Sequence, residues 1–113
     1  MPTSPSSTSQ VIAGVHADLP VPHQATTSRA LLHNDVVRVV VFVFDTGEQL
    51  SEHTAAKPVV VQLLEGRMRF ELDGVDHQLA AGDVVYLAPG APHALEALEP
   101  SRLSLVLVDR EPS

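Results

Sequence analysis

The sequence predicts an all-β domain, an antiparallel sandwich or barrel. Short apolar segments rich in β-branched residues recur at close spacing, and turn residues such as Gly, Pro and Asp separate them. No segment has a convincing helical period. Together these features are typical of about six or seven short antiparallel strands.

The first strands are expected where the apolar runs are longest. Residues 36–44 (VVRVVVFVF) end at a turn of Asp, Thr and Gly, and residues 59–64 (VVVQLL) lie between Pro58 and a Glu-Gly turn. Later strands are expected within residues 67–79, 84–87, 93–95 and 101–109.

Residues 67–79 (RMRFELDGVDHQL) predict a β-hairpin. Apolar and charged side chains alternate up to Asp73-Gly74, a pair that favours a two-residue type I′ turn. The predicted register then puts one apolar face toward the barrel interior. It places Leu72 opposite Val75, Phe70 opposite His77, and Met68 opposite Leu79.

Residues 1–28 are expected to lie outside the barrel. Residues 1–10 are almost entirely Ser, Thr and Pro, which predicts a disordered tail. Residues 11–28 have scattered apolar side chains and no helical period, which favours an extended arm. The barrel domain is therefore expected over residues 29–110, and the chain of 113 residues has room for one such core.

Two predicted strands are apolar on both faces. Arg38 is the one interruption in residues 36–44, and Gln62 is the one interruption in residues 59–64. A strand whose outer face meets water should alternate, so we expect both outer faces to be covered. A homodimer is the predicted cover, with the arm at 11–28 as the competing explanation.

Composition excludes several classes of function. Seven Lys and Arg against 14 Asp and Glu give a net charge of −7, which argues against binding nucleic acid or an anionic membrane surface. The chain has no Cys, so it has neither disulfides nor thiolate metal sites, as fits a reducing compartment. No basic leader precedes Arg29, and we expect a cytoplasmic location.

Two segments carry a family resemblance. GEQLSEHTAAKPVVVQLLEGRMRFELDG (47–74) and AAGDVVYLAPGAPHALEA (80–97) resemble the two motifs of the cupin superfamily. The matching positions are Gly47, His53 and Gly66 in the first motif, and Gly82, Gly90 and His93 in the second. The resemblance implies the cupin barrel, an antiparallel double-stranded β-helix or jelly roll, similar to the small RmlC-like members.

The resemblance also implies a metal site, of which this chain keeps a part. Cupins that use Fe, Mn, Ni, Cu or Zn bind one divalent ion through three His and one Glu. Here Ala55 stands at the second His and Val59 at the Glu, so His53 and His93 remain as the expected metal ligands. Two ligands are fewer than catalytic metal sites usually have.

Other side chains are candidates for this pocket. Gln62 has the opposite strand parity to Val59, so only a bulge would turn it inward. His77 shares an apolar face and is more simply explained as a packed core residue than as a ligand. His16, His23 and His33 lie outside the motifs and are expected on the surface or the arm.

Three functions remain open at this point. The chain could be a metal-dependent enzyme, like a dioxygenase or isomerase, or a non-catalytic binding or sensor module without metal, or a structural dimer. Histidines can also serve as general acid and base without a metal. The apolar Ala55 and Val59 favour a small, partly hydrophobic organic ligand in each of the first two cases.

Overall fold

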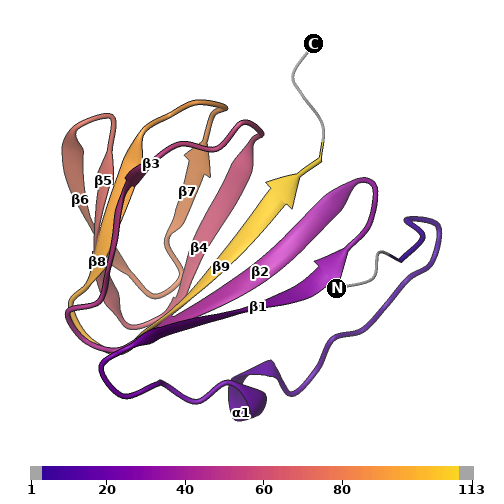
Figure 1. Ribbon diagram of the computed structural model, residues 1–113, viewed down its shortest axis with the longest axis horizontal. Helices are drawn as coiled ribbons and strands as arrows, with labels where there is room; N and C mark the ends of the chain where they lie inside the picture. Colours follow the sequence, from indigo (N-terminus) through magenta and orange to yellow (C-terminus); the bar gives the residue numbers. More distant parts are fainter. Residues whose placement is uncertain (1–3, 110–113) are drawn as a thin grey trace.

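The fold is an antiparallel double-stranded β-helix, in which two sheets face each other (Figure 1). The structure, a computed structural model, describes residues 4–109. One sheet has the strand order β1-β2-β9-β4-β7, and the other has the order β3-β8-β5-β6. The elements are α1 (Val15–Asp18), β1 (Thr26–His33), β2 (Val37–Phe44), β3 (Gln49–His53), β4 (Val59–Glu65), β5 (Arg67–Leu72), β6 (Val75–Ala80), β7 (Val84–Leu87), β8 (His93–Ala97) and β9 (Ser101–Val108).

The predicted all-β class is confirmed, although residues 4–109 contain nine strands, more than expected. The strands that the sequence did not reveal are β1 and β3, whose polar side chains hide the period. β1 begins at Thr26, before the expected domain boundary at residue 29, because its first residues pair with the end of β2. The expected end of the domain at residue 110 lies outside the described residues.

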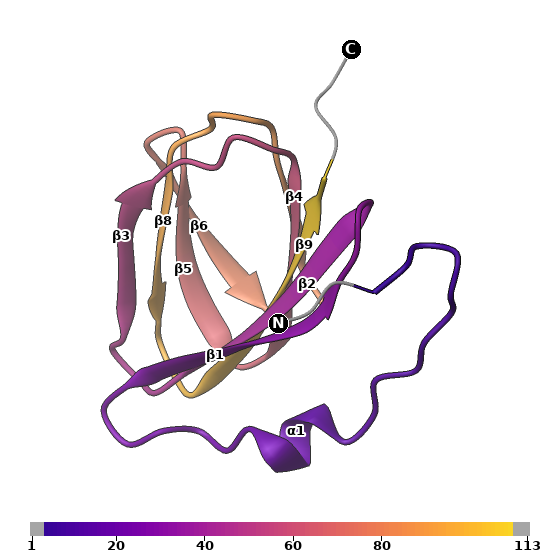
Figure 2. The same cartoon turned by 45° about the vertical axis from the view of Figure 1, so that its right-hand side comes forward.

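The core fills the space between the two sheets, which face each other in Figure 2. Successive side chains of a strand point to opposite faces, so β4 buries every second residue from Val59 to Leu63. The fully buried members of the core with the largest side chains are Phe44, Phe70, Leu63, Met68 and Leu103.

The β5–β6 hairpin confirms the predicted register in full. Leu72 pairs with Val75, Phe70 with His77, and Met68 with Leu79. Asp73 and Gly74 have φ angles of 50° and 79°, both positive as a type I′ turn requires. Local turn chemistry is thus sufficient to set this pairing.

The N-terminal arm covers the outer face of β2. Leu19 packs on Val41 and Val43, which are 3% and 0% exposed. Residues of this arm were expected to be extended throughout, but Val15–Asp18 form one helical turn, which lies below β1 in Figures 1 and 2. This short turn lets both Val15 and Leu19 face the sheet, which a straight segment would not.

A buried arginine fastens the arm to the barrel. Arg102 on β9 is 8% exposed and donates from Nη1 to the carbonyl oxygen of Leu19 at 2.7 Å. Its Nε donates to a carboxylate oxygen of Glu65 at 2.9 Å. The guanidinium therefore joins the arm, β9 and the end of β4 through two hydrogen bonds.

The arm accounts for the apolar outer face of β2 and leaves that of β7 open. On β7, Val84 and Tyr86 are 59% and 60% exposed, and they stand opposite Gln62 and Val60 of β4. A homodimer that covers this part of the sheet stays a prediction. In the part of the chain that the structure describes, no helix is long and apolar enough to cross a membrane.

Replacing Arg102 with alanine should loosen the arm. The substitution leaves the Leu19 carbonyl without its buried donor, so we expect the free energy of unfolding to fall by about 1–3 kcal/mol. Urea denaturation measures this loss. The matched control is Arg67→Ala at an exposed arginine, for which a change below about 0.5 kcal/mol is expected. Equal effects in both variants would contradict a fastening role for Arg102.

The predicted homodimer is tested by sedimentation of the purified chain at micromolar concentration. We expect a dimer for the wild type and for Tyr86→Phe, which preserves the apolar ring. We expect Tyr86→Lys to shift the population toward monomer, because a buried charge without a partner is costly. A wild-type chain that sediments as a monomer is the result that rules the prediction out.

Candidate functional site

His53 and His93 meet on the inner side of the four-stranded sheet. His53 is the last residue of β3 and His93 the first residue of β8, and the two stand directly opposite each other in the ladder. Their ring centroids are 4.1 Å apart, and the ring planes cross at 62°. The structure thus brings the two motif histidines into contact edge to face.

A bulge in β3 turns His53 toward the cavity. Leu50 pairs with Leu95 and His53 pairs with His93, so β3 uses one more residue than β8 over this stretch. Strict alternation would send Leu50 and His53 to opposite faces, yet both line the same cavity. Sequence reasoning placed His53 in the site through the motif and gave no sign of the bulge.

Hydrogen bonds to the backbone fix how each ring presents its nitrogens. The Nδ1 atom of His53 lies 2.8 Å from the carbonyl oxygen of Ser51, and that of His93 lies 2.9 Å from the carbonyl oxygen of Ala91. A carbonyl oxygen only accepts, so each Nδ1 carries the hydrogen and donates it. In the neutral imidazole, each Nε2 is then left as a hydrogen-bond acceptor.

Both Nε2 atoms are available to a ligand. Within residues 4–109, neither forms a hydrogen bond with the protein. Every described side-chain nitrogen or oxygen that is shielded from solvent has a partner. The Nε2 of the buried His93 must therefore be reachable from the cavity.

The cavity beside the histidines has a volume of about 210 Å³ and is otherwise apolar. It is lined by Leu50, His53, Ala55, Val59, Val61, Phe70, Leu87, His93, Leu95, Leu103, Leu105 and Leu107. No carboxylate, ammonium or guanidinium group belongs to this lining. A molecule bound in the cavity would contact the two imidazole rings and otherwise apolar side chains.

The two histidines differ in depth. His93 is 6% exposed and lies parallel to Phe70, with ring planes 3° apart and centroids 6.1 Å apart. His53 is exposed and also lines the cavity. Packing against Phe70 holds the deeper ring in one orientation, whereas the outer ring is held mainly by its bond to Ser51.

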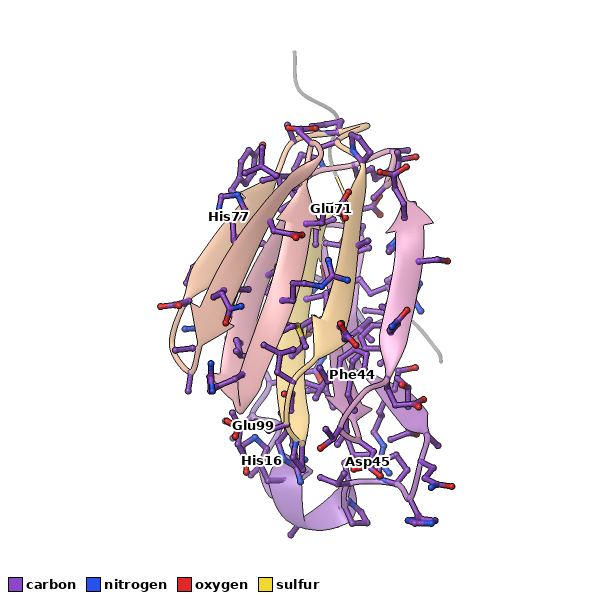
Figure 3. The ribbon with its side chains drawn as sticks, turned by 90° about the vertical axis from the view of Figure 1, so that its left-hand side faces the viewer. His16, Phe44, Asp45, Glu71, His77 and Glu99 are labelled. Atoms are coloured by element: carbon purple, nitrogen blue, oxygen red, sulfur yellow. The ribbon has the colours of Figure 1, made fainter. Side chains whose placement is uncertain are left out.

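The other residues considered for the pocket divide into two groups. Ala55 and Val59 line the cavity. Gln62 is exposed on the opposite face of β4, so it is outside the site. Its Nε2 atom lies 3.5 Å from the carbonyl oxygen of Gly82. His77 shares the face of Phe70, as predicted, but it is not packed in the core: β6 is an edge strand, and His77 is exposed there beside a separate hollow (Figure 3).

The residues present do not fit a tightly held metal ion. Among residues 4–109, no group of three or more His, Cys, Asp or Glu is arranged to hold one. Ala55 and Val59 occupy the cavity wall beside the two histidines and offer no donor atom. Two imidazole nitrogens are fewer than the three or more protein ligands that catalytic metal sites usually have.

The match to a known family covers most of the barrel. Residues 40–109 match the family described as "Cupin domain". This range contains both histidines and all but one of the strands from β2 onward in full. No curated protein matches the chain.

Solved structures share the fold at low sequence identity. A conserved protein of unknown function from Streptococcus pyogenes is 24% identical with a TM-score of 0.79, over 93% of this chain and 92% of that chain. KdgF from a Halomonas species is 23% identical with a TM-score of 0.72, over 76% and 82%. Salicylate 1,2-dioxygenase from Pseudoaminobacter salicylatoxidans is 15% identical with a TM-score of 0.71, and 80% of this chain matches 27% of that one.

Restoring the missing donors should create a metal site. We expect the double variant Ala55→His, Val59→Glu to retain about one Zn²⁺ per chain after dialysis, because four ligands would then surround one point. The wild type should retain well below one. Metal analysis of both proteins measures the difference, with Ala55→Asn, Val59→Gln as the control of similar size. Stoichiometric metal in the dialysed wild type would contradict our interpretation of its donor set.

Proposed function

The chain belongs to the cupin family, and from that premise we propose that it is a binding module for a small, partly apolar organic molecule, held without a metal ion. The observation that carries the proposal is the cavity lining, in which His53 and His93 are the two polar side chains. Pockets of this kind, apolar with a few placed polar groups, are typical of small-molecule sites.

The size and lining of the cavity limit the ligand. Its volume of about 210 Å³ is below the range of roughly 300–1,000 Å³ that is usual for drug-sized ligands. The apolar wall favours a ring or a short hydrocarbon body, since burial of such surface contributes about 25 cal/mol per Å². A compact molecule with one aromatic or aliphatic ring satisfies both conditions.

The histidine pair supplies the polar contact. With each Nδ1 donating to a carbonyl, the two Nε2 atoms accept, so the matching ligand group is a donor such as a hydroxyl. His93 is buried against Phe70, which makes its Nε2 the better-positioned acceptor. The proposed ligand thus carries a hydroxyl at the end that enters the cavity.

A metal-dependent enzyme, dioxygenase-like or isomerase-like, is the second candidate. One observation favours it: histidines that bind metals usually donate their other ring nitrogen to a carbonyl or carboxylate, as His53 and His93 both do. Against this candidate, the cavity offers two imidazole nitrogens, fewer ligands than catalytic metal sites usually have. The metal retention experiment above decides between the two candidates. The cytoplasmic location also stays a prediction.

Phenol is a direct probe of the proposed site, because it combines one ring with one hydroxyl. We expect His93→Phe to weaken phenol binding about tenfold, which corresponds to the loss of one hydrogen bond of about 1.4 kcal/mol. The substitution keeps an aromatic ring at this position, and titration calorimetry measures the affinity. His53→Phe should have the same direction of effect.

The matched control is His77→Phe, an exposed histidine on β6 outside the cavity. It should leave the affinity for phenol unchanged. If the wild type does not bind phenol, or binds it no better than the His93→Phe variant does, the proposed function is overturned. A thermal melt of each variant verifies that the barrel is intact.

A further inference from the structure

A second, polar hollow adjoins the apolar cavity at its mouth. It has a volume of about 310 Å³ and is lined by His33, Arg38, Lys57, Leu107, Val108 and Asp109. Leu107 lines both this hollow and the cavity of the two histidines. Most of the residues that line it lie at the ends of β1 and β9 and at the start of β2, and these strand ends come together in Figure 1.

Strand register explains why Arg38 belongs to the cavity side of the sheet. Arg38 on β2 pairs with Leu107 on β9, and Leu107 pairs with Val59 on β4. Directly paired residues point to the same face, and Leu107 and Val59 both line the cavity. Adjacent strands are about 4.8 Å apart, so Arg38 begins roughly 10 Å from Val59, within reach of a long side chain.

His33 joins the same group at the surface of the barrel. It is the last residue of β1 and pairs directly with Arg38. Both side chains line the polar hollow. The sequence could not show this grouping, since it depends on β1 pairing with β2 around a bulge.

The charges of the hollow favour an anion. Among the described residues, Arg38 forms no ion pair with a carboxylate, although the chain has 14 acidic residues. Lys57 and Asp109 form an ion pair, and this contact holds the pKa of the Asp109 carboxyl below its ordinary value. Two cations and one carboxylate leave the hollow with a net charge of +1, in a chain of net charge −7.

We propose that the ligand is a small organic carboxylate, whose apolar body fills the histidine cavity and whose carboxylate is bound by Arg38 at the mouth. This inference rests on the proposed function and adds the chemical class of the ligand. A guanidinium matches the planar carboxylate with two parallel N–H donors. A hydroxyl at the far end of such a molecule would reach the Nε2 atoms of His53 and His93.

The test compares an acid with its neutral counterpart. We expect 4-hydroxybenzoate to bind the wild type about tenfold more tightly than 4-hydroxybenzamide does, since a charge-assisted pair is stronger than a neutral contact. In Arg38→Gln the preference should fall to about twofold or less. Arg38 is exposed, so the substitution should not disturb folding.

The matched control is Arg67→Gln, at another exposed arginine without a described ion pair, located on β5 away from the mouth. It should preserve the tenfold preference for the acid. Equal binding of acid and amide to the wild type, with phenol still bound, overturns the carboxylate inference and leaves the proposed function standing. If neither phenol nor 4-hydroxybenzoate binds, both proposals are overturned together.

Discussion

Successive side chains of a strand point to opposite faces, and the site of this barrel depends on that constraint and on a departure from it in β3. On β2, Phe42 and Phe44 therefore pack in the core, and Val41 and Val43 pack against the arm on the other face. At the end of β3 an extra residue reverses the alternation and brings His53 to the inner face. The site exists because a regular ladder is interrupted at one point.

The same interruption also sets the chemistry of that histidine. Ser51 lies within the bulged stretch, and its carbonyl oxygen accepts the hydrogen bond from Nδ1 of His53. His93 obtains its corresponding acceptor, the carbonyl of Ala91, from the loop before β8. Two unrelated pieces of backbone therefore produce the same result, a ring that offers Nε2 to the cavity.

Sequence reasoning succeeded where the determinants are local. Asp73-Gly74 sets the hairpin register through turn geometry alone, and the motif spacing around His53 and His93 implied their convergence. Sequence reasoning failed where the burial or grouping of a side chain depends on which strands are adjacent in the sheet. His77 has the parity of a core residue but is exposed because β6 is an edge strand, and the grouping of His33 with Arg38 follows from strand order.

Arg102 and Leu107 lie on the same strand, β9, near its opposite ends. Arg102 binds the arm on the outer face of the sheet, and Leu107 lines both the apolar cavity and the polar hollow. About 16 Å of β9 lies between them. Core residues such as Val59, Phe70 and Leu103 also form the cavity wall, so a substitution there alters ligand preference and the packing of the barrel together. Arg38 is exposed, so the binding of a charged group can change at that position with little effect on the core.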